Sequence, residues 1–241
     1  MRWLAAWLQI LRISGAVTLL SNAVAAWAFV IYVDGSDPLL LAEKLYRTSH
    51  HALWVLATSL LLYLNGMLWN ALLDMDRDRE LHPTRPLITG RISPGTAMVV
   101  GCLLSVGTLL VGLQLGFRGF LSAGVVLMLT FCYNAAAKHL PYLGSICMGL
   151  VRAAHAVFVL LALGPDLFDR MLITSVSWLV DVESMGLVGL PPVYPLLLFS
   201  YVCGLTLISE LESRFGRRID LLLATLLLVA PIPFLLLRIF G

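Results

Sequence analysis

The most evident shortage in this chain is charge. Only 12% of its 241 residues are charged, whereas 60% are hydrophobic, and the mean hydropathy is +0.93. A soluble core of this size does not need so much apolar surface, so the composition excludes an ordinary soluble domain and predicts a polytopic membrane protein. The net charge of +2 indicates little about partners, because the arrangement of the charges matters more than their sum.

The chain also lacks cysteines that are spaced for chemistry. All four fall inside apolar runs and none belongs to a CxxC motif, so we interpret them as core thiols rather than disulfides or metal ligands. The sequence has no soluble domain, low-complexity segment or clear internal repeat, and we expect residues 1–241 to form a single transmembrane domain. The cysteines are Cys102, Cys132, Cys147 and Cys203.

Long apolar runs, separated by turn residues such as Gly and Pro, dominate the chain. Runs of about 20 residues are long enough to cross a bilayer as helices. We therefore predict an all-α transmembrane helical bundle with about seven spans. Between spans, the longest stretch is 165–192, whose moderately apolar piece Met171–Val180 is expected at the membrane interface or as a re-entrant segment. The predicted spans are 8–33, 52–73, 95–116, 119–137, 143–164, 193–211 and 220–240.

Basic residues are unequally divided between the two predicted sides of the membrane. Nine lie on the side of the N-terminus and of the loop at 77–91, against five on the other. Cytoplasmic loops carry an excess of Lys and Arg. We therefore expect an integral protein of the cell inner membrane, with the N-terminus and the 77–91 loop in the cytoplasm.

The second predicted span ends in acidic and amide side chains. Asn70, Asp74 and Asp78 are four residues apart, so on a helix they lie along one face. An aspartate at the centre of a bilayer costs about 2.5–3.5 kcal/mol on insertion scales, and less near the ends. Such residues indicate a metal ion or a charged substrate, and their hard oxygen atoms suit Mg²⁺. The alternative is a solvated helix end whose acids are balanced by Arg77 and Arg79.

Basic residues follow on the same side of the membrane. Arg85 and Arg91 lie in the loop 82–93 and are suited to grip phosphate oxygens through their guanidinium groups. Tyr133 and Lys138 stand where the fourth span meets its loop. The alternatives are ordinary positive-inside anchoring for the arginines, and an interfacial aromatic with a snorkelling lysine for the second pair.

Later spans carry further polar groups. Arg152 lies roughly 13 Å into the fifth predicted span, where an arginine must face the bundle interior or a wet cavity. One alternative is an ion pair with an acid such as Glu210 that serves packing only, and we interpret His155 as a satisfied core residue. Glu210, Glu212 and Arg214 close the sixth span on the same side as the acids of the second.

Facing acids and bases of this kind fit a diphosphate held through Mg²⁺. The first span adds Arg12 and the deep polar Asn22. The metal would neutralise a leaving diphosphate and the bases would share its charge. Apolar helix faces could take a long hydrocarbon tail, and an acceptor would trap the allylic cation in a cavity that excludes water.

An ordered tract in the chain resembles the first signature of the UbiA superfamily of intramembrane prenyltransferases. The tract is Asn70-x-x-x-Asp74-x-x-x-Asp78, then Arg85-Pro86-Leu87 and Gly90–Ser93. The resemblance covers about residues 12–218. It implies an all-helical bundle with a cytoplasm-facing cavity and Mg²⁺-dependent transfer of a polyprenyl group from its diphosphate to an aromatic or lipid acceptor.

The resemblance also implies roles for individual residues. Asn70, Asp74 and Asp78 would bind Mg²⁺–diphosphate, and Lys138 and Arg12 would help to hold phosphate. Tyr133 and Lys138 are similar to the family's tyrosine and lysine before the fifth helix. With Arg152 added, the predicted catalytic residues are Asp74, Asp78, Lys138 and Arg152. The predicted substrate-binding residues are Arg12, Asn22, Asn70, Arg85, Tyr133, Glu210, Glu212 and Arg214.

Two departures from the family pattern bear on whether the chain catalyses prenyl transfer. Family members usually have nine spans, whereas seven are predicted here, and the second signature, DxxxD, is replaced by Glu210-Leu-Glu212-Ser-Arg214. These features are more similar to a divergent UbiA-like branch, with EboC-type proteins as the nearest group. The alternative function is a non-catalytic UbiA-like protein that binds or helps to export a prenylated or hydrophobic precursor.

Overall fold

The computed structural model describes residues 2–33, 38–164, 169, 193–212 and 218–232, and these residues form helices joined by turns, with no strand. The prediction of an all-α bundle is confirmed. Its α-helices are α1 (Arg2–Leu11), α2 (Ala16–Val33), α3 (Pro38–Leu73), α4 (Met75–Leu81), α5 (Pro94–Gly112), α6 (Gly116–Ala135), α7 (Leu143–Leu163), α9 (Val193–Glu212) and α10 (Arg218–Val229). Short 3₁₀ turns are η1 (Ile13–Gly15), η2 (Leu113–Leu115) and η3 (Ala137–His139).

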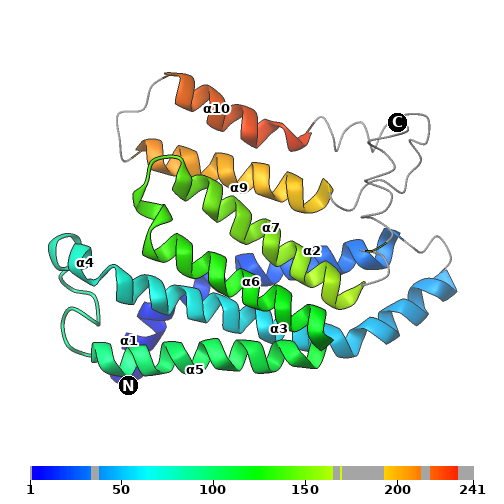
Figure 1. The fold of residues 1–241 in the computed structure, drawn as a ribbon, viewed down its shortest axis with the longest axis horizontal. Helices are drawn as coiled ribbons and strands as arrows, with labels where there is room; N and C mark the ends of the chain where they lie inside the picture. The colour runs from blue at the N-terminus through cyan, green and yellow to red at the C-terminus, as the bar shows by residue number, and fades with distance from the viewer. Residues whose placement is uncertain (1, 34–37, 165–168, 170–192, 213–217, 233–241) are drawn as a thin grey trace.

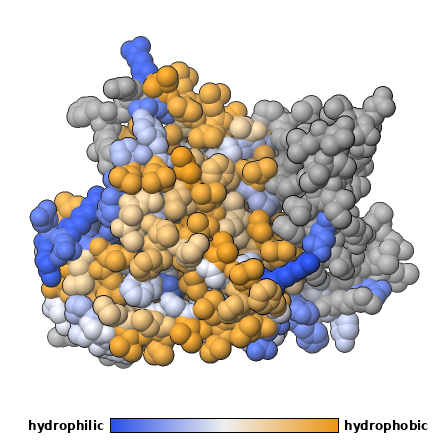
Figure 2. All heavy atoms as spheres, viewed as in Figure 1, coloured by the Kyte–Doolittle hydropathy of each residue, from blue (hydrophilic) through white to orange (hydrophobic). Residues whose placement is uncertain are grey.

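Five segments of the described chain are long and apolar enough to cross a membrane. One of them, Pro94–His139, contains both α5 and α6, which are separated by η2 and by Gly116 at φ +75°. The expected count of seven stays a prediction, because part of the run 220–240 and all of Met171–Val180 lie outside the described residues. Figure 2 shows apolar residues across most of the visible face and a hydrophilic group at the end that carries α4. The chain is an integral membrane protein.

Most of the long helices lie side by side in one row. Figure 1 shows α10, α9, α7, α6, α3 and α5 in this order from top to bottom, and each of them contacts its neighbour in the row. Helix α2 contacts both α3 and α7. The main apolar core lies between these helices, and its fully buried side chains include Phe158, Val159 and Leu160 of α7.

The expected first span, 8–33, is not one helix, and this part of the prediction is wrong. Helix α1 ends at Leu11, and Arg12 adopts a left-handed backbone conformation with φ 43° and ψ 53°. Such a conformation costs a residue other than Gly roughly 1–2 kcal/mol. The Tyr63 hydroxyl group offsets part of that cost by donating a 2.6 Å hydrogen bond to the Arg12 carbonyl oxygen. Gly15 makes this approach possible, because a Cβ atom there would lie 2.3 Å from the Tyr63 oxygen.

A second apolar cluster joins α1 to the loop between α4 and α5. Trp7 and Ile10 of α1 pack with Leu68 of α3, and Leu87 and Ile92 supply the loop's share. The loop then enters α5 through Ser93, which caps the helix by accepting a 3.0 Å hydrogen bond from the Thr96 amide, with Pro94 at the first helical position. This cluster fixes α1 and the loop against the end of α3 at which the acidic residues lie.

The four cysteines are free thiols. Cys147 and Cys203 are buried, as expected of core residues, whereas Cys102 and Cys132 are exposed on α5 and α6. The prediction of core thiols is therefore wrong for these two. Apolar runs alone do not separate the two cases, because a membrane helix is apolar on its lipid-facing side as well as on its packed side.

Candidate functional site

Asn70, Asp74 and Asp78 lie along one face of an almost continuous helix, as their spacing predicts. Helix α3 ends at Leu73 and α4 begins at Met75, so Asp74 stands at the junction. Backbone hydrogen bonds bridge that junction, from the Asp74 amide to the Asn70 carbonyl (3.0 Å) and from the Asp78 amide to the Asp74 carbonyl (2.8 Å). The i to i+4 pattern is thus kept, and the three side chains stay aligned over successive turns.

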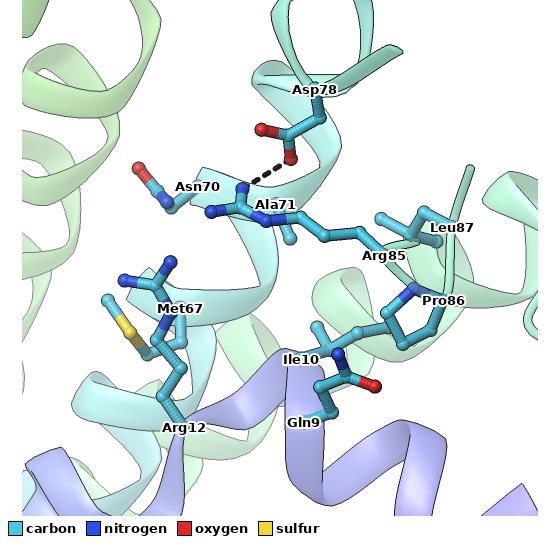
Figure 3. A pocket seen from close by; sticks show the side chains of 10 residues that line it. All are labelled: Gln9, Ile10, Arg12, Met67, Asn70, Ala71, Asp78, Arg85, Pro86 and Leu87. Atoms are coloured by element: carbon cyan, nitrogen blue, oxygen red, sulfur yellow. Dashed lines mark hydrogen bonds and ion pairs between the residues drawn. The ribbon is translucent and has the colours of Figure 1, made fainter. Parts of the chain in front are cut away.

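Arg85 pairs with the last of these acids. Its guanidinium group donates a hydrogen bond to a carboxylate oxygen of the buried Asp78 (Figure 3). Arg85 lies in the loop that precedes α5, and the other arginine of this loop, Arg91, has a different position. Arg91 donates to the Thr84 carbonyl (2.8 Å) and to the Gln9 side chain (3.3 Å), so it fastens the loop to itself and to α1.

Lys138 forms an ion pair with Asp74, the other acid on this helix face. It belongs to η3, directly after α6, and its ammonium nitrogen lies 2.7 Å from Asp74 Oδ1. The same nitrogen donates a 2.9 Å hydrogen bond to Asn70 Oδ1. Both partners of the ion pair are largely buried, with side-chain exposures of 9% for Lys138 and 13% for Asp74. The contact with Asp74 is an ion pair without the alignment of a hydrogen bond, and Asp74 Oδ1 is a buried oxygen that accepts none within the described residues.

A cavity of about 160 Å³ opens beside these residues. Figure 3 shows the guanidinium groups of Arg12 and Arg85 pointing into the space beside Asn70. Asp74 and Lys138 do not line the cavity but contact Asn70, which does. The lining residues are Gln9, Ile10, Arg12, Met67, Asn70, Ala71, Asp78, Arg85, Pro86 and Leu87.

The charges around the cavity favour an anion. Among the residues that line the cavity, Asp78 carries one negative charge and Arg12 and Arg85 carry two positive charges, which leaves one positive charge. Bases held in a partly dry site attract phosphate more strongly than bases in water do. The Ile10, Met67 and Leu87 side chains supply apolar wall to the same cavity.

The same donor set fits a hard divalent cation. Asn70, Asp74 and Asp78 offer amide and carboxylate oxygens, and the buried Asp74 Oδ1 lacks a hydrogen bond. No group of three or more His, Cys, Asp or Glu residues suited to a metal occurs in the described part of the chain. The two carboxylates and the amide oxygen suit Mg²⁺, which binds through one or two carboxylates and completes its shell with water and substrate phosphates.

Glu210 of α9 lies beside the start of α7. Its Oε1 accepts a 3.0 Å hydrogen bond from the Ser145 hydroxyl group, and a Cβ atom at Gly144 would lie 2.8 Å from that oxygen. The half-buried Tyr133 lies within electrostatic range of both Glu210 and Asp74. The Glu212 side chain and Arg214 lie outside the described residues.

Two further predicted site residues, Asn22 and Arg152, do not line the cavity. Asn22 donates to Nδ1 of His155 (2.9 Å) and accepts from the Tyr194 hydroxyl group (2.7 Å). The other ring nitrogen of the buried His155 contacts Ser59 Oγ at 2.9 Å, so His155 is a satisfied core residue. The spacing along the first span gives the depth of Asn22 but not the direction of its side chain.

Arg152 is the second of these residues. It is half-buried in α7 and lies within electrostatic range of Tyr63 and His155. Among the described residues no ion pair joins Arg152 to Glu210, the acid named as an example in the packing alternative. Sequence reasoning also missed Gln9 and Ile10 as lining residues, because a continuous span over 8–33 has no bend at Arg12.

The model of the UbiA prenyltransferase family matches residues 25–239. A curated relative, digeranylgeranylglyceryl phosphate synthase of Pyrococcus horikoshii, is 32% identical over 95 residues, which are 39% of this chain and 34% of that protein. The match thus spans about a third of the relative's length.

Solved structures give the same fold. A structure of digeranylgeranylglyceryl phosphate synthase in membranes superposes with a TM-score of 0.67 at 18% identity, over 100% of this chain and 80% of that one. A UbiA homolog from Archaeoglobus fulgidus, bound to DMAPP and Mg²⁺, superposes with a TM-score of 0.56 at 18% identity, over 95% of this chain and 85% of that one. Since the family model covers most of the sequence, this chain belongs to the UbiA prenyltransferase family.

Proposed function

We propose that this chain transfers a prenyl group from a prenyl diphosphate to a hydrophobic acceptor inside the membrane, with Mg²⁺ as its cofactor. The observation that carries the proposal is the arrangement of Asn70, Asp74 and Asp78 on one helix face, with Lys138 and Arg85 in contact with them. Family membership supports it, as do the homologs from Archaeoglobus fulgidus that are bound to DMAPP or GPP with Mg²⁺.

The residues around the cavity would share the work of breaking the bond to diphosphate. Asn70, Asp74 and Asp78 would hold the metal, which neutralises charge on the leaving diphosphate when it is bound. Arg12, Arg85 and Lys138 would donate hydrogen bonds to the phosphate oxygens. The carbon–oxygen bond breaks with its electron pair on the diphosphate, the prenyl carbon bonds to the acceptor, and the acceptor loses a proton.

The surroundings support a hydrophobic donor and acceptor. Ile10, Met67 and Leu87 line the cavity beside the charged groups, where the carbons nearest the diphosphate would lie. The acceptor, aromatic or lipid, would enter between this wall and the side chains of Tyr133 and Glu210. We place the cavity on the cytoplasmic side of the cell inner membrane, because the positive-inside count puts the 77–91 loop there. Residues 1–241 would act as one domain.

The direct test is transfer of a labelled prenyl group by the purified full chain in detergent. DMAPP, GPP and longer prenyl diphosphates are offered to aromatic and lipid acceptors with and without Mg²⁺. Asp74→Asn and Asp78→Asn should each lower the rate by about 10²-fold or more, because stabilisation of the leaving charge is lost. Asp76→Asn is the matched control, because Asp76 is exposed on α4 and pairs only with the exposed Arg79 within the described chain.

Two results would count against the proposal. Full activity in Asp74→Asn and Asp78→Asn would remove the metal assignment. Tight binding of prenyl diphosphate without turnover across the whole acceptor panel would favour the alternative, a non-catalytic protein that binds or helps to export a prenylated precursor.

A further inference from the structure

Each acid of the site is already occupied by a base from another segment. Lys138 lies 2.7 Å from Asp74 Oδ1 and donates to Asn70 Oδ1 at 2.9 Å, and Arg85 donates to Asp78. The metal of the proposed function would bind the same three side chains, and Asn70 has only the one side-chain oxygen that already accepts from Lys138. The bases are therefore competitors of a cation at the site, in addition to being donors to phosphate.

The competition is electrostatic, and the distances and the burial set its strength. A Mg²⁺ ion about 2.0–2.1 Å from these side-chain oxygens would lie within a few ångströms of the ammonium and guanidinium groups, even where one oxygen binds the metal and a base through different lone pairs. Two cations this close also repel each other strongly where water is scarce. The Lys138 and Asp74 side chains are only 9% and 13% exposed, so little solvent screens that repulsion.

A displaced base needs a new partner. An ammonium group left buried without a counter-ion is costly, whereas a diphosphate beside it supplies several acceptor oxygens. The cavity has room for such an anion next to Asn70, and its net charge favours one. A metal ion that binds without a diphosphate supplies no counter-ion for the displaced Lys138 and Arg85.

We propose that Lys138 and Arg85 hold the metal-binding oxygens in the substrate-free protein, and that they release them only when a diphosphate is present to take up their charge. The two bases thus make metal loading dependent on substrate loading. This inference rests on the proposed function for the identity of the ligand, and it adds a gating role for these two residues.

The proposal predicts opposite effects of one substitution on two measured affinities. Lys138→Gln keeps a hydrogen-bond donor for Asn70 but removes the charge. The Kd for a divalent cation alone should fall by about five-fold or more, which lies in the usual range of coupling between sites. The tightening of cation binding by a diphosphate should shrink by a similar factor, because that coupling is reciprocal.

The experiment uses Mn²⁺ as the cation, because free and bound Mn²⁺ differ in their electron paramagnetic resonance signal, and inorganic pyrophosphate as the diphosphate. The full chain in detergent is titrated with Mn²⁺ with and without saturating pyrophosphate. Arg79→Gln is the matched control, since Arg79 also pairs with an aspartate, Asp76, but both are exposed on α4. We expect Arg79→Gln to change neither Kd, whereas Lys138→Gln and Arg85→Gln change both.

The two measured affinities distinguish the results that support the inference from those that overturn it. An unchanged or higher Kd for Mn²⁺ alone in Lys138→Gln overturns the inference, and so does a lower Kd with the pyrophosphate coupling intact. Should Lys138→Gln fail to fold, Arg85→Gln is judged by the same two criteria, because Arg85 is more exposed and pairs with a different acid. The readout involves no prenyl transfer. A confirmed exchange without turnover would refute the proposed function alone, and turnover without exchange would refute the gating role alone.

Discussion

Tyr63 of α3 holds the backbone of Arg12 through a 2.6 Å hydrogen bond from its hydroxyl group to the Arg12 carbonyl oxygen. The bond fixes the point at which α1 ends, and it thereby directs the Arg12 side chain into the cavity beside Asn70 (Figure 3). The most exposed cation of the site is thus positioned by a residue that does not line the cavity.

Tyr63→Phe removes that bond and nothing else from the ring. We expect a loss of about 1 kcal/mol of stability, the usual contribution of one hydrogen bond. The KM for prenyl diphosphate should rise more than kcat falls, because Arg12 would lose its fixed direction. Steady-state kinetics and thermal unfolding in detergent measure both effects. An unchanged KM would show that Arg12 does not depend on Tyr63.

Asn22→Ala tests whether Asn22 binds substrate or supports the core. The substitution leaves His155 Nδ1 and the Tyr194 hydroxyl group without the partner they have now. We expect a loss of about 1 kcal/mol in stability, as for other polar contacts between membrane helices. The midpoint of unfolding should therefore fall, with little change in the KM for prenyl diphosphate. A ten-fold rise in KM at an unchanged midpoint of unfolding would indicate that Asn22 binds substrate.

Gly149→Val should destabilise the contact between α7 and α9. A Cβ atom at Gly149 would lie 2.9 Å from a ring carbon of Phe199 and 3.0 Å from its carbonyl oxygen, and a backbone atom yields less easily than the end of a flexible side chain. Overpacking of this kind costs about 1–3 kcal/mol. Gly107→Ala in α5 is the control, since a Cβ atom there meets nothing within 4 Å. Thermal unfolding should separate the two variants, and equal midpoints would contradict the tight contact.

Chelation should abolish transfer while barely changing the stability of the protein. EDTA removes the metal, but Lys138 and Arg85 already pair with Asp74 and Asp78. The midpoint of unfolding in EDTA should therefore lie within a few degrees of that in Mg²⁺. In Lys138→Gln the same comparison should show a larger gain from Mg²⁺, because Asp74 has lost its internal counter-charge. A large EDTA effect on the unmodified chain would argue against these pairs.

Local spacing predicted the acidic half of the site well. The four-residue repeat of Asn70, Asp74 and Asp78 needs only the geometry of a helix, and the backbone hydrogen bonds across the α3–α4 junction preserve it. The side of the membrane was enough to bring Lys138 near these residues. Tertiary packing, which no local pattern encodes, decides that Lys138 contacts Asp74 and Asn70. It also decides that Arg85 pairs with Asp78.

The directions of the side chains and the continuity of the first helix were harder to predict from the sequence. Hydropathy counted 8–33 as one run because it is insensitive to backbone dihedral angles, so the break at Arg12 was missed. It gave the depth of Asn22 and Arg152 but not the neighbours that their side chains face. The close contact of Gly15 with Tyr63 stabilises the chain at the break, and it joins residues far apart in sequence.

The contact between α3 and η3 also has a consequence for how the protein is made. Lys138 comes 68 residues after Asn70, so the ribosome has released the end of α3 long before its counter-charge exists. Until α6 has been inserted, the translocon must hold a helix whose end carries an uncompensated carboxylate. Biogenesis would therefore have a checkpoint at α6. A nascent chain that stops before Lys138 should leave the end of α3 in water or bound to a chaperone, and longer chains should draw it into the bundle.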